Sequence, residues 1–151
     1  MKRALGYGLL AFAAISVAYA VFEKGAPAPR TAVPPVIQET TRPVVIARYC
    51  HGNARCSNCI KIENYSREAV ETGLRKELDS GRLRFETVNV DESANRHFIK
   101  DYGLYTKSLV LVRESGGKEV RHKVLTDVWD HLDDKDAFIA YVRKETEEFL
   151  K

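Results

Sequence analysis

The distribution of proline sets the limits of the part of this chain that can fold. All five prolines lie between residues 27 and 43, where small and polar residues separate them. A segment of this composition favours extended, polyproline-like conformations and buries too little apolar surface to form a core. We therefore expect residues 23–43 to be a proline-rich linker and residues 44–151 to form one domain, which suits a chain of 151 residues that is 44% hydrophobic.

The first 22 residues have the character of a membrane-directed segment. Lys2 and Arg3 precede an uncharged run over residues 4–22, which as a helix would be about 28 Å long, close to the ~30 Å hydrocarbon core of a bilayer. Residues 1–22 are then either an uncleaved transmembrane anchor or a signal peptide that is cut after the Ala-Tyr-Ala sequence at 18–20. In both cases the positive-inside rule keeps the N-terminus in the cytoplasm. We expect an extracytoplasmic, periplasmic domain, anchored to the inner membrane or secreted.

The charge balance argues against a nucleic-acid partner. The chain has 24 cationic and 21 anionic side chains and a net charge of +3. Such a balance gives no sequence-wide field that would attract a polyanion.

Strand and helix signals alternate along residues 44–151. Apolar runs predict strands at residues 44–47, 83–90, 109–112 and 119–124, the last two joined by a hairpin turn at Gly116 and Gly117. Helical signals predict helices over residues 56–78, from 91–93 through 102, around Trp129 and after 134; the expected breaks and caps are Ser66, Thr126 or Asp127, and Asp134. The order β-α-β-α-β-β-α predicts an α/β fold with a mixed four-stranded sheet flanked by helices.

Two cysteines stand where the first strand gives way to the first helix. Cys56 and Cys59 are separated by Ser57 and Asn58, a spacing that can close a disulfide or clamp a metal. The unpaired N–H groups and positive dipole end of a helix stabilise a thiolate at its first turn, which favours the disulfide. The motif therefore predicts a redox dithiol.

The element order and this motif resemble the thioredoxin fold over residues 44–151. The likeness extends to YCHGNARCSNC at residues 49–59, IENY at 62–65, DYGL at 101–104 and TKS at 106–108. These segments resemble the small thioredoxin-like family called the nitrophenyl-compound nitroreductase subunit, which is found with arsenic-resistance genes. The resemblance implies a protein thiol or disulfide partner more than nitro-group reduction, because the chain has no flavin-binding signature.

The thioredoxin resemblance implies a role for each cysteine. Cys56 would be the attacking thiolate and Cys59 the thiol that resolves the mixed disulfide. Arg55 beside Cys56, together with the helix start, would lower the thiol pKa from about 8.5 toward the 3.5 to 7.5 range of reactive cysteines. The implied protein is a monomeric thiol-disulfide oxidoreductase that needs no cofactor beyond its redox-active disulfide.

Three departures from the thioredoxin pattern concern the site. Ser57 and Asn58 replace the residues common between the cysteines, so the reduction potential does not follow from the motif. Lys107 stands where thioredoxins have a cis-proline before the third strand. There is also no Asp or Glu between Val44 and Cys56, so the first strand lacks the buried carboxylate that assists proton transfer in many thioredoxins.

Cys50 leaves several interpretations open. It is either a small buried hydrophobe at the end of a strand or a third redox thiol. Together with His51, Cys56 and Cys59 it would also supply a ligand set for Zn or Cu(I), which would make the chain a metal-binding module. A third alternative is a non-catalytic interaction subunit of a redox complex. The substrate, the redox partner and the direction of electron flow do not follow from the sequence.

Overall fold

The computed structural model describes residues 42–151, which contain the whole predicted domain. The predicted anchor at 1–22 and nearly all of the predicted linker at 23–43 lie outside the described residues. Within residues 42–151, no helix combines the length and the apolar character that crossing a membrane requires.

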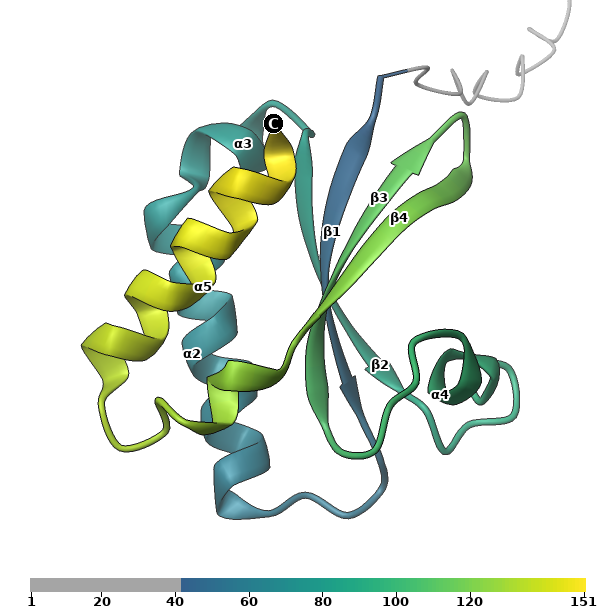
Figure 1. The fold of residues 1–151 in the computed structure, drawn as a ribbon, viewed down its shortest axis with the longest axis vertical. Coiled ribbons are helices and arrows are strands. Elements are labelled where there is room, and N and C mark those ends of the chain that lie inside the picture. Colours follow the sequence, from purple (N-terminus) through teal and green to yellow (C-terminus); the bar gives the residue numbers. More distant parts are fainter. Residues whose placement is uncertain (1–41) are drawn as a thin grey trace, which may run out of the picture. The chain divides into compact units, whose positions relative to one another are not determined.

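Four strands form one mixed sheet (Figure 1). The strands are β1 (Val44–His51), β2 (Leu83–Asn89), β3 (Ser108–Ser115) and β4 (Lys118–Leu125), and their order in the sheet is β2-β1-β3-β4. β1 pairs in parallel with β2 and antiparallel with β3, and β3 pairs antiparallel with β4. Parallel pairing of β1 and β2 requires a crossover connection, which the helical segment between them provides.

Helices cover both faces of the sheet (Figure 1). The helices are α2 (Ser57–Gly73), α3 (Arg75–Asp79), α4 (His97–Asp101) and α5 (Lys135–Leu150), with a 3-10 turn, η1 (Thr126–Trp129), after β4. α2 and α5 pack against one face, and α4 lies over the other. This strand order and connectivity is the thioredoxin-like fold, so the predicted fold class is confirmed.

Side chains of β1 alternate between two hydrophobic clusters, as the period of two in a strand requires. Val45, Ala47 and Tyr49 belong to the larger cluster beneath α2 and α5. Ile46 and Cys50 belong to the smaller cluster on the face that α4 covers. The two faces of β1 are therefore both buried, which explains its nearly continuous apolar sequence.

Several predicted boundaries are confirmed. Gly116 and Gly117 have φ values of 58° and 72°, the positive φ that a two-residue hairpin turn needs at both central positions. The Asp134 side chain accepts a hydrogen bond of 2.9 Å from the N–H of Ala137 and begins α5. Asp134 thus satisfies one of the N–H groups that a helix start leaves unpaired.

Other predicted boundaries are wrong. The helix that was expected to break or be capped at Ser66 runs through this fully buried residue and is interrupted at Leu74, next to Gly73, where a Cβ would collide with the Arg143 side chain. α4 begins at His97, because residues 91–96 form turns and not the first turn of a helix. Neither Thr126 nor Asp127 caps η1, which begins after Leu125 with no side-chain cap.

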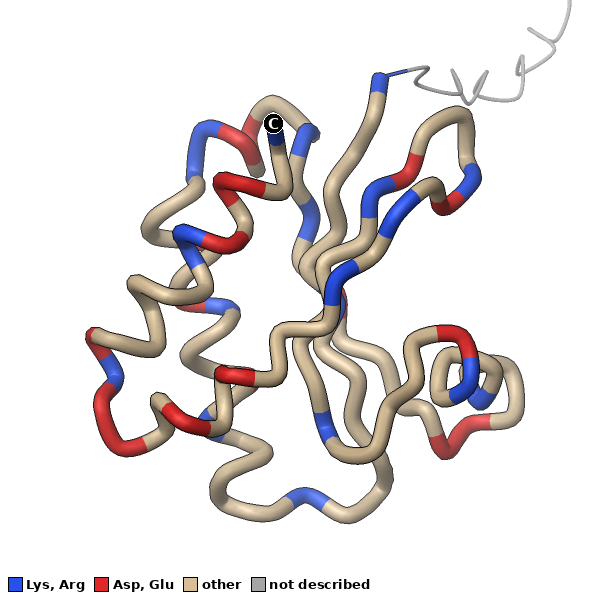
Figure 2. The backbone as a smooth tube through the Cα atoms, viewed as in Figure 1, with Lys and Arg blue, Asp and Glu red and all other residues tan. Residues whose placement is uncertain are grey.

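Charged residues of both signs are interspersed on the described elements (Figure 2). α3 and α5 each carry Lys or Arg together with Asp or Glu.

Candidate functional site

The two cysteines of the CxxC motif form a disulfide at the start of α2. Cys56 is the N-cap residue, with extended backbone angles, and its side chain is exposed. Cys59 lies one turn further and is only 1% exposed, with its Cα 5.0 Å from that of Cys56. One sulfur is therefore accessible to a partner, and the other is shielded.

The backbone around the disulfide favours negative charge on the Cys56 sulfur. The N–H of Cys59 donates a hydrogen bond of 3.1 Å to Cys56 Sγ, so the sulfur takes the place that an N-cap oxygen usually has. The first turn of α2 contains no acidic residue, and the positive end of the helix dipole is not neutralised there. Both features stabilise a thiolate at Cys56 once the disulfide is reduced.

Tyr49 of β1 holds the buried end of the motif. Its hydroxyl donates a hydrogen bond of 2.7 Å to the carbonyl oxygen of Cys59. Burial raises the pKa of Tyr49 to about 12, so the hydroxyl keeps its proton at neutral pH. The bond joins the end of β1 to the first turn of α2, on the side of the disulfide away from solvent.

Arg55, which was predicted to stabilise the Cys56 thiolate, pairs with a carboxylate in the disulfide form of the protein. Its guanidinium forms an ion pair with Glu63, which lies two helical turns into α2. The Glu63 side chain is 15% exposed and also contacts Arg67, at 3.4 Å. Glu63 belongs to the IENY segment at 62–65, but no role for its carboxylate was predicted, although its position at i+4 from Cys59 puts it on the same helix face as the buried cysteine.

The loop that precedes Cys56 is held by residues at the end of β2 and just after it. The carboxylate of Asp91 accepts a hydrogen bond of 2.6 Å from the N–H of Asn53, and Asn89 donates one of 2.8 Å to the Asn53 side chain. A Cβ at Gly52 would lie 2.7 Å from Asp91 Oδ2, so a larger residue would displace this carboxylate. Sequence reasoning had missed this contact, because it depends on the parallel pairing of β1 and β2.

The remaining predicted residues lie around the same end of the sheet. Ser57 and Asn58 are exposed on the first turn of α2. Lys107 is half-buried, and its carbonyl accepts a hydrogen bond of 3.0 Å from the indole N–H of Trp129. Every peptide bond in residues 42–151 is trans, including the one before Lys107.

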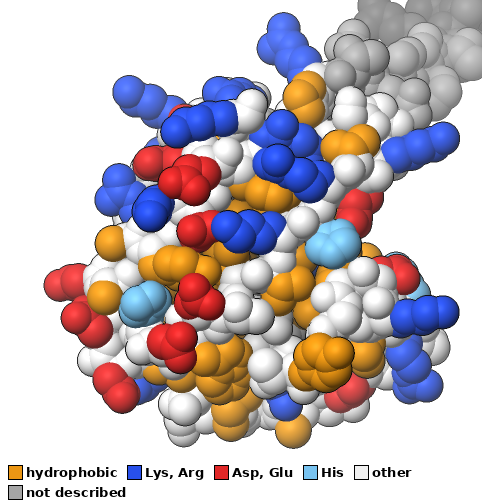
Figure 3. Space-filling view, in the orientation of Figure 1, with side chains coloured by type: hydrophobic (Ala, Val, Ile, Leu, Met, Phe, Trp, Pro, Cys, Tyr) orange, Lys and Arg blue, Asp and Glu red, His pale blue; other side chains and the backbone are white. Residues whose placement is uncertain are grey.

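A cavity of about 180 Å³ lies between the loop that joins β1 to α2 and the segment that leads into β3. Its lining includes Cys50, Ala54, Tyr105 and Lys107. Tyr105 is fully exposed, and Ile60 on the first turn of α2 is 45% exposed. Figure 3 shows apolar side chains reaching the surface at the lower end of the view, where Figure 1 places the loop between β1 and α2. Apolar surface therefore lies near the accessible sulfur.

Cys50 is a buried thiol on the other face of the sheet. It is 1% exposed and packs in the cluster of Ile46, opposite the face that α2 covers. Burial raises the pKa of Cys50 to about 11, so it is protonated at neutral pH and lacks the ionised sulfur of a reactive cysteine.

The structure does not bring the alternative metal ligands together. No group of three or more His, Cys, Asp or Glu side chains within residues 42–151 is arranged to hold a metal ion. Cys56 and Cys59 are bonded to each other, and the Cys50 side chain points to the opposite sheet face.

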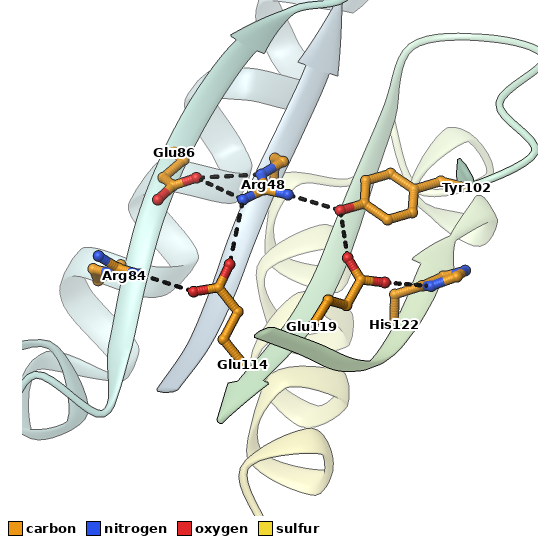
Figure 4. A network of polar contacts seen from close by, with 7 residues as sticks. All are labelled: Arg48, Arg84, Glu86, Tyr102, Glu114, Glu119 and His122. Carbon is orange, nitrogen blue, oxygen red and sulfur yellow. Dashed lines mark hydrogen bonds and ion pairs between the residues drawn. The ribbon is translucent and has the colours of Figure 1, made fainter. Parts of the chain in front are cut away.

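A charged network occupies the α4 face of the sheet (Figure 4). At its centre is Arg48 of β1, which is 8% exposed and contacts Glu86 at 3.1 Å and the hydroxyl of Tyr102 at 2.7 Å. Tyr102 donates to Glu119, which in turn pairs with His122. The first strand thus carries a buried cation. The network links β1 to β2 through Glu86, to β3 through Glu114, and to β4 through Tyr102 and Glu119.

Comparisons with known proteins do not show a family for this chain. No protein-family model matches the sequence, and no curated protein matches it. Among solved structures, the chain is similar to the crystal structure of Trxlp from Edwardsiella tarda EIB202, with 20% identity and a TM-score of 0.36 over 70% of this chain and 85% of that one. The fold assignment stands on the strand order and connectivity of the chain itself.

The fold and the disulfide together define the class of the domain. Residues 44–151 form a thioredoxin-like module with a Cys56–Cys59 thiol-disulfide pair at the start of its first helix.

Proposed function

We propose that this chain is a thiol-disulfide oxidoreductase that exchanges with a partner protein through Cys56 and Cys59. The observation that carries the proposal is the asymmetry of the pair. Cys56 is exposed at a helix N-terminus, whereas Cys59 is 1% exposed behind it. Such an arrangement lets a partner reach one sulfur and keeps the other for the resolving step.

In the reducing direction, the reaction starts from the dithiol. The Cys56 thiolate attacks one sulfur of a partner disulfide, a mixed disulfide forms, and the partner's other sulfur leaves as a thiolate that takes up a proton. Cys59 loses its proton and attacks Cys56 Sγ, which releases the second partner thiol and forms the disulfide seen in the structure. Two electrons and two protons pass to the partner. The oxidising direction is the reverse, with a partner dithiol as the reductant.

Cysteine variants test this proposal in an insulin-reduction assay with dithiothreitol. We expect Cys56→Ser to abolish turnover and Cys59→Ser to accumulate mixed disulfides, which would appear as dithiothreitol-sensitive adducts on a non-reducing gel. Cys50→Ser is the matched control, because this buried thiol lies on the opposite sheet face, and it should keep the wild-type rate. Normal turnover by both Cys56→Ser and Cys59→Ser would refute the enzyme and leave the interaction subunit as the better account.

Location and biological setting are part of the same proposal. Lys2 and Arg3, followed by the uncharged run to residue 22, support an N-terminal helix that exports the domain or tethers it to the inner membrane. A periplasmic oxidoreductase of an arsenic-resistance system would fit the resemblance in the CxxC region. Protease added to spheroplasts should degrade the domain, and its protection until the membrane is lysed would contradict export.

A further inference from the structure

Glu63 lies between two arginines, one of which precedes the reactive cysteine. Its carboxylate pairs with Arg55 on one side and with Arg67 on the other. Arg67 is itself held against β2, with its guanidinium 4.7 Å from the ring centroid of Phe85 and 3.4 Å from Thr87 Oγ1. A line of contacts therefore runs from the edge strand β2 to the residue next to Cys56.

The Arg55–Glu63 pair also lies close to the buried end of the disulfide. Tyr49 donates its hydroxyl proton to the carbonyl of Cys59, and both charges of the pair act on this hydroxyl. After the larger effect of burial, Arg55 lowers the pKa of Tyr49 and Glu63 raises it. The pair is therefore within electrostatic reach of the hydroxyl that bonds the first turn of α2, and Arg55 directly precedes Cys56 in the sequence.

We propose that Glu63 competes with the Cys56 thiolate for the guanidinium of Arg55 and thereby sets the reactivity of the dithiol. In the disulfide form, Cys56 carries no charge, and Arg55 pairs with Glu63. On reduction, the thiolate becomes a second anion next to the same cation. The carboxylate of Glu63 partly neutralises the guanidinium of Arg55 and so weakens its attraction for the thiolate. Glu63 is therefore a positioning residue that acts through Arg55. The inference rests on the proposed thiol-disulfide exchange.

The direction of the effect follows from charge alone. When Glu63 is neutral, Arg55 is free to pair with the thiolate, and the reduced form of the dithiol becomes more stable. A stabilised thiolate makes a disulfide a stronger oxidant. Because Arg55 is one third exposed, solvent screens the interaction, and pairs of this kind change an ionisation equilibrium by about two- to fivefold.

The test is the pH dependence of alkylation of the reduced full-length chain by iodoacetamide. Glu63→Gln keeps the size and helix propensity of the side chain and should raise the acid dissociation constant of Cys56 by about two- to fivefold. Cys50 does not interfere, because it is buried and its pKa is about 11. His51, whose ring stacks on that of Tyr49 with the centroids 5.9 Å apart, is unchanged in every variant.

A double-mutant cycle separates competition for Arg55 from a direct effect of the Glu63 charge. In an Arg55→Gln background, the shift caused by Glu63→Gln should disappear, because there is no guanidinium to release. Glu71→Gln is the matched control on the same helix; Glu71 pairs with Arg67 at 3.9 Å and is half exposed, so its loss should leave the alkylation profile unchanged. A shift that persists without Arg55, or no shift in Glu63→Gln, would overturn the proposal.

The equilibrium with glutathione provides a second readout. Glu63→Gln should move the reduction equilibrium toward the dithiol by no more than the same factor. These measurements need no partner protein, so they can succeed even if the insulin assay fails. If Cys56→Ser keeps full turnover, the proposed function fails, whereas an unchanged Cys56 ionisation in Glu63→Gln refutes only the role of Glu63.

Discussion

Replacing Arg48 by methionine should cost less stability than removing its partner Glu86. Arg48 is 8% exposed and donates two hydrogen bonds, of 3.1 and 3.2 Å, to one oxygen of Glu86. Its other partners are the Tyr102 hydroxyl at 2.7 Å and Glu114 at 4.0 Å (Figure 4). The two variants leave different charges without a partner. Loss of Glu86 leaves a buried cation, whereas Arg48→Met leaves carboxylates that reach water.

The magnitudes follow from this difference. A buried charge whose partner is removed costs about 3–5 kcal/mol, whereas an ion pair replaced by an apolar side chain of similar volume is often neutral. Glu86 is 34% exposed, and Glu114 remains near Arg48, so we expect about 2–3 kcal/mol for Glu86→Ala. In Arg48→Met, Tyr102 still donates to Glu119 and the thioether packs on Phe98, where the guanidinium now lies. Its cost should stay below about 1 kcal/mol.

Urea unfolding of the oxidised protein at pH 7 gives both free energies. Arg84→Met is the matched control, because Arg84 pairs with Glu114 at the surface, and this loss should cost less than about 0.5 kcal/mol. Combining Arg48→Met with Glu86→Ala should recover most of the stability that Glu86→Ala alone removes. A larger loss in Arg48→Met than in Glu86→Ala would refute the reasoning that the unpaired buried cation dominates.

Two further predictions concern the site. Gly52→Ala should lower the free energy of unfolding by about 1–3 kcal/mol in thermal unfolding, because the added methyl group displaces Asp91 from the N–H of Asn53. In an Asp91→Ala background the same change should be nearly neutral. An equal cost there would exclude this contact as the cause. Burial raises the pKa of Cys50 to about 11, above its value in the unfolded chain, so the unfolded state loses its proton first as the pH rises above about 9. The free energy of unfolding should therefore fall from pH 9 toward 11 in the wild type and fall less in Cys50→Ala; equal slopes would show that Cys50 does not contribute.

The sequence predicted the dithiol but not the charges that surround it. Cys56 and Cys59 were found from spacing and from their place between a strand and a helix, and the structure puts one at the surface and the other inside. Arg55 was expected to lower the pKa of Cys56, but its ion pair with Glu63 was not predicted. Glu63 is the first carboxylate after the motif in the sequence, but side-chain packing decides whether an arginine meets it.

The helix boundaries show the same limit at the level of the backbone. Asp134 and the Gly116–Gly117 turn were predicted because each acts on its own neighbours in the chain. The break was predicted at Ser66, but it follows Gly73, a poor helix former whose missing Cβ leaves room for the Arg143 side chain of α5. The side chain that fills this space lies 70 positions away in sequence.

By itself, the sequence determined the class of fold, the strand order of the hairpin and the redox pair, because apolar periodicity, turn residues and cysteine spacing are local properties of the chain. Only the tertiary structure decided that Cys50 faces away from the dithiol, that Asp91 holds the loop between β1 and α2, and that Arg48 is a buried cation. Each of these depends on which strands pair and on which sheet face a helix covers, and such contacts between distant residues are set when the whole domain packs.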